Sequence, residues 1–263
     1  MGALAVQDES FGDLLRSWRQ RRRVSQLDLA IEADVSARHI SFLETGRARP
    51  SREMVMKLSE ELEVPLRHRN KLLVAAGFAP VFRERAVRAP EMAVVRQALD
   101  KILAGHEPYP AVVVDSAWNL VAANAAASIF MEGVPAELLK EPINVMRLTL
   151  HPDALGGKLA NLAEVRAYAL HQLRRLAETS GSDEIASLHD EVAAYTYPGV
   201  ELNVAHVPGP ADILVPMRIR QGDRILSMFT TIATFGTPMD VTVSELAIET
   251  FWPGDEETAA AFR

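Results

Sequence analysis

The 263-residue sequence contains no cysteine. This absence excludes disulfides, thiolate nucleophiles and every zinc or iron–sulfur site that needs a cysteine ligand. No apolar run approaches the roughly 18 residues of a membrane-spanning helix. Asp8, Glu9 and Asp13 interrupt the only N-terminal stretch that could resemble a secretion signal. We therefore expect a cytoplasmic protein without membrane contact.

Motifs of common enzymes are also missing. The histidines have no HxH or HExxH spacing, and the chain has no GxSxG, GxGxxG or P-loop sequence. Self-cleaving repressors use a Ser–Lys pair, but Lys101, Lys140 and Lys158 do not lie on an expected strand beside a serine. The alternative that the C-terminal domain is an enzyme therefore has no sequence motif in its support. We expect no catalytic residues, no metal site and no cofactor.

The charge is unevenly distributed along the chain. Residues 1–88 carry 16 basic and 12 acidic side chains, whereas the rest carry 12 and 23. A basic end joined to an acidic body suits one domain that meets phosphates and another that does not. The alternative is two solvated surfaces of opposite sign.

Residues from Ser10 to about Phe78 predict a compact all-helical unit. Ser25 and Ser36 each precede a short helical pattern, and Asp28 completes a capping box with Ser25. The two helices meet at a tight turn around Ala33–Val35, which is the spacing of a helix-turn-helix. The positions expected to point inward are Leu27, Ala30, Val35, Ile40 and Leu43.

This packing leaves the first turn of the second helix free to face DNA. We predict that the helix that begins at Ser36 reads bases with Arg38 and its neighbours, because arginine can form two parallel hydrogen bonds to guanine. Residues that flank it suit phosphates or an adjacent base. The predicted DNA-binding residues are Gln26, Ser36, Ala37, Arg38, His39, Ser41, Phe42, Thr45, Arg47 and Arg49.

The segment SQLDLAIEADVSARHISFLETGRARPS resembles the Cro/repressor-type (XRE) helix-turn-helix family. Further segments, among them PYPAVVVDSAWNLVAAN, RLTLHPD, TIATFGTPMDVT and ELAIETFWPGDEET, resemble the narrower group of MmyB-like transcription regulators. The resemblance runs over nearly the whole chain. It implies a PAS-like C-terminal domain, in which helices wrap an antiparallel sheet around a small-molecule pocket, and it associates that pocket with fatty acid.

The residue pattern of the C-terminal part agrees with this fold class. Ala79–Pro90 is typical of a linker, and residues 91–103 predict a helix. The expected strands are 111–115, 118–122, 213–220, 224–234 and 247–252, with helices at 124–131 and 159–178. We therefore expect an all-helical DNA-binding domain (8–78), a linker with a connecting helix (79–104) and a mixed α+β domain (105–263). Strand 224–234 is apolar on both sides and needs cover on both.

A site for an acyl chain needs apolar walls and one polar group for the carboxylate. The candidate wall residues are Phe130, Met131, Met146, Leu148, Tyr168, Met217, Met228 and Phe229. The candidate head-group residues are Arg147, His151 and Arg166, and the alternative for His151 is a cap on the following helix. The alternative is that the apolar members are simply core and that Arg166 forms an internal salt bridge.

Together these patterns predict a DNA-binding regulator that senses a small apolar ligand, with fatty acid or a similar lipid as the candidate. A homodimer is expected, because such DNA-binding heads read half-sites about one helical turn apart. The alternative is a regulator whose second domain only dimerises or contacts a protein partner.

Overall fold

The computed structural model describes residues 9–200, 202 and 214–263. The chain forms two compact units. The first contains the N-terminal residues up to Arg85 together with the later segment Pro238–Ser244, and the second contains Ala86–Thr237 and Glu245–Arg263. The predicted linker is thus divided, because its first residues belong to the helical unit.

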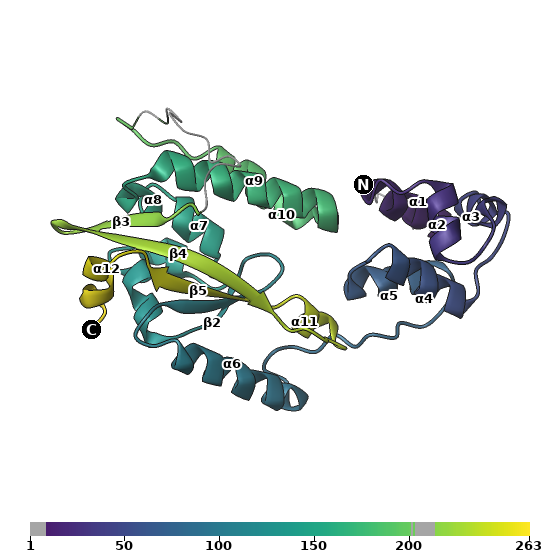
Figure 1. The fold of residues 1–263 in the computed structure, drawn as a ribbon, viewed down its shortest axis with the longest axis horizontal. Coiled ribbons are helices and arrows are strands. Elements are labelled where there is room, and N and C mark those ends of the chain that lie inside the picture. Colours follow the sequence, from purple (N-terminus) through teal and green to yellow (C-terminus); the bar gives the residue numbers. More distant parts are fainter. Residues whose placement is uncertain (1–8, 201, 203–213) are drawn as a thin grey trace, which may run out of the picture. The chain divides into compact units, whose positions relative to one another are not determined.

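The first unit is built from short helices (Figure 1). Their apolar side chains pack together in one core. The helices are α1 (Phe11–Arg21), α2 (Gln26–Glu32), α3 (Ala37–Glu44), α4 (Arg52–Glu61) and α5 (Leu66–Ala75). The hydroxyls of Ser25, Ser36 and Ser51 each accept a hydrogen bond from the backbone N–H three residues later. Such caps satisfy N–H groups that have no partner inside the helix, and they fix the predicted starts of α2, α3 and α4.

One detail of the predicted core is wrong. Leu27 was expected to point inward, but 59% of it is exposed, whereas Leu29 is fully buried. Ala30, Ile40 and Leu43 are buried as expected. Helix α2 is only seven residues long and apolar at several registers, so periodicity alone does not distinguish its two sides.

The chain beyond α5 stays attached to the first unit. Asn70 donates a hydrogen bond to the carbonyl of Phe82 and accepts one from its N–H. Arg85 then forms a 2.7 Å ion pair with Asp240, which lies in the returning segment Pro238–Ser244. This segment carries the short helix α11 (Val241–Ser244), and Val241 is completely buried. The helix-turn-helix unit is therefore completed by residues from far along the chain.

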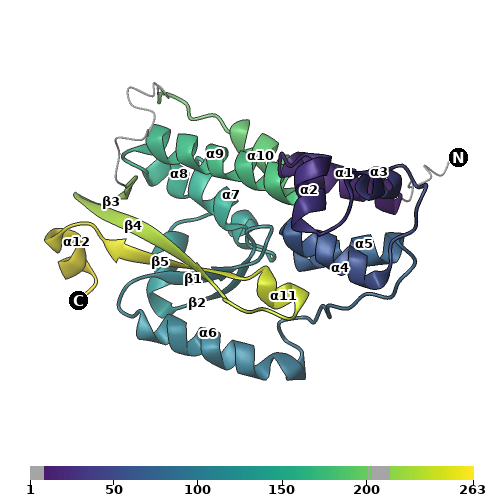
Figure 2. The same ribbon diagram turned by 45° about the vertical axis from the view of Figure 1, so that its right-hand side comes forward.

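The second unit contains a five-stranded antiparallel sheet with the strand order β2-β1-β5-β4-β3 (Figures 1 and 2). Its strands are β1 (Ala111–Val114), β2 (Leu120–Ala123), β3 (Met217–Gln221), β4 (Arg224–Thr234) and β5 (Ala247–Pro253). A helix-turn-helix unit followed by a mixed α+β domain confirms the predicted fold class.

Helices lie on both sides of this sheet (Figure 2). Helix α6 (Ala93–Gly105) packs on one face, where it contacts β1. The larger core lies on the other face and holds the remaining helices of that side. These are η2 (Ala125–Met131), α7 (Val145–Leu150), α8 (Leu155–Lys158), α9 (Leu162–Ser180) and α10 (Asp183–Ala193). The short η3 (Ala136–Leu139) packs in a smaller separate apolar cluster that includes Leu148 of α7. The short η1 (Pro90–Met92) leads into α6, and α12 (Glu256–Ala261) follows β5.

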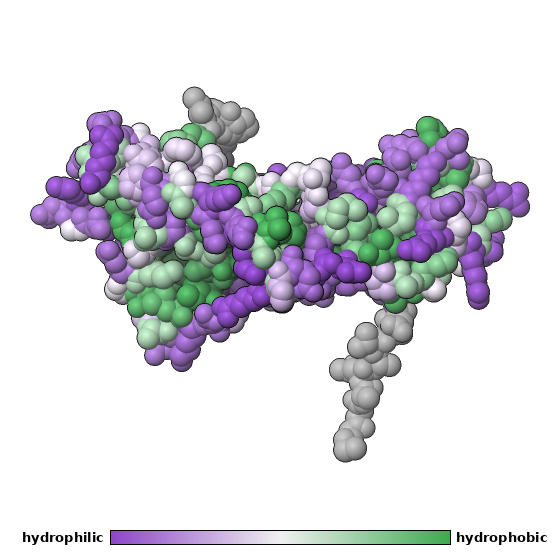
Figure 3. All heavy atoms as spheres, turned by 90° about the horizontal axis from the view of Figure 1, so that it is seen from below, coloured by the Kyte–Doolittle hydropathy of each residue, from purple (hydrophilic) through white to green (hydrophobic). Residues whose placement is uncertain are grey.

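The two faces of β4 are covered to different extents. On the face of the larger core, Leu226 and Met228 are buried. On the opposite face, Ile225 is 50% exposed, and Trp252, from the neighbouring strand, is 40% exposed. The space-filling view shows apolar patches on the second unit among polar surface (Figure 3). The expected cover on both sides of this strand is therefore incomplete.

Candidate nucleic-acid interface and ligand cavity

The amino-terminal half of α3 is held with its polar side chains outward. Ile40 and Leu43 are buried beneath the helix, while Arg38 is exposed. The Ser36 hydroxyl caps the helix by accepting from the N–H of His39 at 3.1 Å. Helix α3 thus has the arrangement of a reading helix, with an apolar underside and a free polar first turn.

Two arginines flank the ring of Phe42. The guanidinium carbon of Arg38 lies 5.0 Å from the ring centre, and that of Arg47 lies 6.0 Å away. Such cation–π contacts order long side chains that would otherwise sample many rotamers. Within the described residues, Arg38, Arg47 and Arg49 form no ion pair, and all three are exposed. Their charge is therefore available to phosphates.

The remaining predicted DNA contacts lie on α3, at its end or at the start of α2. Ala37, His39, Ser41 and Phe42 are partly exposed, and Thr45 is exposed. The Thr45 hydroxyl donates to the Ser41 carbonyl at 2.7 Å. Gln26 donates from its side-chain nitrogen to the Glu44 carboxylate at 2.8 Å.

Glu44 is a buried carboxylate that the sequence did not single out. Its side chain has no exposed surface, and Arg19 donates to both of its oxygens at 2.6 and 3.0 Å. Arg16 approaches it at 3.4 Å. Burial by itself would raise the pKa of Glu44, but the hydrogen bonds from Arg19 and Gln26 lower it below its ordinary value. The carboxylate ties α1 and α2 to the end of α3.

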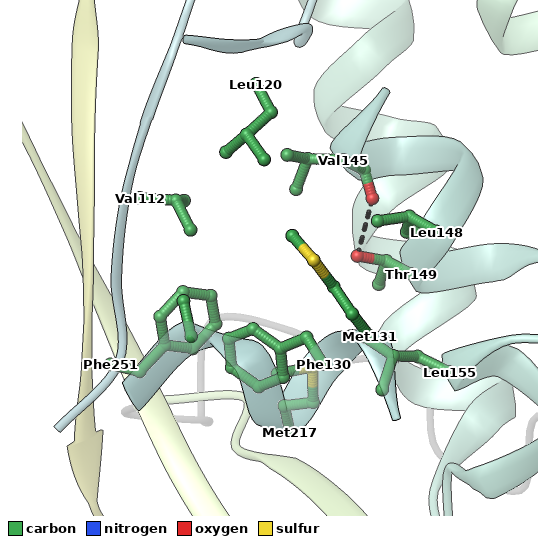
Figure 4. Close-up of a pocket in the computed structure, with 11 residues that line it drawn as sticks. Val112, Leu120, Phe130, Met131, Val145, Leu148, Thr149, Leu155, Met217 and Phe251 are labelled. Carbon is green, nitrogen blue, oxygen red and sulfur yellow. Dashed lines mark hydrogen bonds between the residues drawn. The ribbon is translucent and has the colours of Figure 1, made fainter. Parts of the chain in front are cut away.

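An apolar cavity lies between the sheet and the helices of the second unit (Figure 4). The Met131 side chain reaches into its middle, and Thr149 is the one polar residue of its lining. The Thr149 hydroxyl donates to the Val145 carbonyl at 2.8 Å and is thus satisfied within α7. The lining residues are Val112, Leu120, Ala127, Phe130, Met131, Val145, Leu148, Thr149, Leu155, Met217 and Phe251. The cavity measures about 30 Å³, which is room for about two water molecules.

A polar network fixes the helical wall of this cavity to the sheet. Between β1 and β2, the Asp115 carboxylate accepts from the backbone N–H of Asn119 at 2.8 Å and of Ala117 at 2.9 Å. Asn144 donates to the Ala117 carbonyl at 2.8 Å and caps α7 with its side-chain oxygen. Trp118 adopts a φ of +65°, an uncommon conformation for a bulky residue, and its side chain is buried in the core.

The structure brings four of the predicted ligand residues to the cavity: Phe130, Met131, Leu148 and Met217. Met146 and Met228 are buried in the surrounding core but do not line it. Tyr168 is 51% exposed on α9. Phe229 lies opposite Trp252 on the other face of the sheet. The pattern did not identify Val112, Leu120 or Phe251, although the alternation along their strands is the signal that places them on one face.

The two predicted head-group arginines are engaged elsewhere. Arg147 forms two hydrogen bonds of 2.7 Å with the Glu191 carboxylate, which raise the pKa of this arginine. Arg166 donates to the Ala193 carbonyl at 2.6 Å. Its Nε is buried without a hydrogen-bond partner among the described residues. Neither arginine lines the cavity.

In the described part of the chain, no three His, Asp or Glu side chains gather in a way that could hold a metal ion. Likewise, none of the helices in these ranges combines the length and apolar character needed to cross a membrane.

Comparison with known proteins assigns both units. Residues 10–72 match a helix-turn-helix domain family, and residues 95–263 match the family of the MmyB-like transcription regulator ligand binding domain. The chain is also 37% identical over 83 residues to the HTH-type transcriptional repressor RghR of Bacillus subtilis (strain 168). That similarity covers 31% of this chain and 58% of the relative. The protein is a DNA-binding transcription regulator with a ligand-binding domain, and it belongs to the family of MmyB-like transcription regulators.

Proposed function

We propose that this regulator binds a small apolar ligand in the cavity of its second unit and that the ligand changes its affinity for operator DNA. The observation that supports this most is the lining of the cavity, where ten of eleven residues are apolar and Thr149 is already hydrogen-bonded. Such a surface favours hydrocarbon over water. The resemblance to MmyB-like regulators adds fatty acid or a similar lipid as a candidate, within a PAS-like domain.

Ligand entry requires the cavity to widen. At about 30 Å³ it is smaller than the 300 Å³ or more of common small-molecule sites. Met131 is the side chain suited to this change, because it is partly exposed and extends into the middle of the cavity. Methionine is unbranched and adapts to irregular shapes. Its displacement would open room for an aliphatic chain.

Replacing Met131 with alanine is expected to shift the preferred ligand toward longer chains. Each additional buried methylene contributes about 0.8 kcal/mol, or roughly a fourfold gain in affinity. We expect the best binder in a series of C6 to C12 alcohols to lengthen by about two carbons, as measured by isothermal titration. Met239→Ala is the matched control, because Met239 is 77% exposed and lies outside the cavity. An unchanged chain-length profile in Met131→Ala would contradict this role.

In DNA binding, we expect the first turn of α3 to contact bases and the arginines just beyond its end to contact phosphates. Replacing Arg47 with alanine is expected to weaken binding to all sequences alike. Loss of one phosphate contact should reduce the slope of log K against log salt by about 0.9. Fluorescence anisotropy at several salt concentrations measures this slope. A loss confined to the specific operator would instead place Arg47 at a base.

The regulator is proposed to act as a homodimer in the cytoplasm, with ligand binding changing the relative placement of its two DNA-binding heads. A ligand acts only through different affinities for two states. The test is native mass spectrometry after mild purification, followed by operator binding with and without the copurified compound. A bound lipid that changes operator affinity supports sensing. A ligand-free mass, with operator binding unaffected by aliphatic probes, supports the alternative of a dimerisation or partner-binding domain.

A further inference from the structure

The chain passes between the two units three times. It leaves the first unit after Arg85, returns at Pro238 and leaves again after Ser244. The segment Pro238–Ser244, which connects β4 with β5, therefore belongs to the helix-turn-helix unit. Boundaries between domains usually fall in exposed, flexible linkers that few contacts cross. Here, by contrast, a connection between two strands of the ligand-binding unit is built into the DNA-binding unit.

Several contacts hold this segment in the first unit. Asp240 pairs with Arg85 at 2.7 Å, and the N–H of Val241 donates to the Arg83 carbonyl at 2.8 Å. Asp240 and Val241 are both buried, and α11 packs against α5. Displacing the segment would expose Val241 and separate the ion pair, and both changes cost free energy. The segment therefore moves together with the DNA-binding helices.

The residues next to the three passages pack together in the second unit. Val87, Phe235 and Leu246 all belong to the apolar cluster between α6 and the sheet, which we call the α6 cluster. One residue separates Val87 from the first unit, one separates Leu246 from it, and two separate Phe235 from it. A residue spans at most about 3.6 Å. Connections this short leave little slack between the α6 cluster and the helix-turn-helix unit.

The α6 cluster also includes the strands that form one wall of the cavity. It contains Ala111 and Val113 of β1 and Ile248 of β5. The cavity lies on the opposite face of the sheet, where Val112 of β1 and Phe251 of β5 line it, because successive residues of a strand point to opposite faces. Protein interiors are close-packed and transmit strain. An occupant that displaces β1 or β5 therefore displaces the α6 cluster as well.

We propose that the α6 cluster and the segment Pro238–Ser244 form the device that couples the cavity to the DNA-binding unit. It rests on the proposed function and adds the route by which a ligand changes operator affinity. A ligand that widens the cavity shifts β1 and β5, and the three short passages transmit this shift to the first unit. Such coupling is reciprocal, so bound operator changes the affinity for the ligand by the same factor.

The test lengthens two of the passages without removing a side chain. The variant of the full chain carries two additional glycines after Gly236 and two after Glu245, so that one short linker remains. Decanoate and 1-decanol are the probes, and the operator is selected from random duplexes with the unaltered protein. Fluorescence anisotropy measures operator affinity with and without each probe, and calorimetry measures binding of the probes.

We expect a saturating probe to change the operator affinity of the unaltered protein at least about fivefold, the lower end of common coupling factors. In the lengthened variant this change should fall below about twofold, while the affinities for probe alone and for operator alone stay within about twofold of the unaltered protein. The matched control carries four glycines after Gly222. This insertion lengthens the turn between β3 and β4, which lies within the second unit, and should keep the full change.

The outcomes separate this coupling from the proposed function. If the lengthened variant keeps the full change in operator affinity, the coupling role is overturned and the proposed function stands. If neither probe changes the operator affinity of the unaltered protein, both fall together. Should the variant not fold, hydrogen exchange of the unaltered protein decides the matter. A bound probe should change the exchange rates of the amides in Pro238–Ser244, and unchanged rates there overturn the coupling role.

Discussion

Replacing Glu44 with alanine is expected to destabilise the helix-turn-helix unit by about 3–5 kcal/mol, the cost of breaking a buried ion pair from one side. The change would remove the group that accepts from Arg19, Arg16 and Gln26. Arg19, whose side chain is only 13% exposed, would keep a charge without its partner. Urea unfolding of the full chain, followed by circular dichroism, measures the loss. Glu60→Ala is the control, because Glu60 is exposed on α4 and should change stability by less than about 0.5 kcal/mol.

The effect of Glu44 depends on pH with a defined sign. Its pKa is lowered in the folded state, so its stabilising contribution is complete above the unfolded value of about 4.3 and is lost as the pH falls through the folded pKa. We therefore expect the stability difference between the unaltered protein and Glu44→Ala to be constant near neutrality and to shrink below about pH 4. A difference that does not change down to pH 2 would show that packing, rather than the ionised carboxylate, provides the stabilisation.

Replacing Arg38 with alanine is expected to cost about 1–3 kcal/mol in operator binding and to relax the preference at one base pair. The exposed guanidinium over Phe42 stands at the start of α3, where bidentate contact with guanine is geometrically accessible. Arg38→Lys keeps the charge but not the planar fork, so it should retain non-specific affinity and lose the base preference. Anisotropy with single-base operator variants measures both quantities.

The control for this series is Arg88→Ala, which removes one exposed positive charge outside the helix-turn-helix unit. It should leave the base preference unchanged. If Arg38→Ala binds the operator variants with the same ranking as the unaltered protein, the proposed reading register of α3 is wrong, and a neighbouring residue such as Ser41 or His39 becomes the candidate for base contact.

Much of the first unit could be predicted because its determinants are local. Ser25, Ser36 and Ser51 mark the starts of three helices, because each hydroxyl accepts a hydrogen bond from the backbone N–H only three residues later. Glu44 could not be predicted in the same way. A glutamate in a helical pattern is usually solvated, and its burial depends on arginines about 25 residues earlier in the chain.

In the second unit, too, contacts between residues far apart in the sequence could not be predicted. The alternation in β1 and β5 fixes which residues share a face, but not that the two strands pair, which joins Val112 to Glu249 across more than half of the chain. Four of the predicted ligand residues reach the cavity because η2, α7 and β3 are adjacent in space. Arg147 and Arg166 looked suited to a carboxylate ligand, since the sequence does not show that residues of the later helix α10 pair with them.

The return of Pro238–Ser244 to the helix-turn-helix unit has a consequence for dividing this protein into parts. A recombinant fragment that stops at Arg85 would lack Asp240 and Val241, and would leave the guanidinium of Arg85 without its ion pair. The complementary fragment from Ala86 onward would carry Val241 without the core that buries it. No single cut yields two intact halves. A fusion in which residues 238–244 follow residue 85 through a short glycine linker is the truncation that preserves the unit.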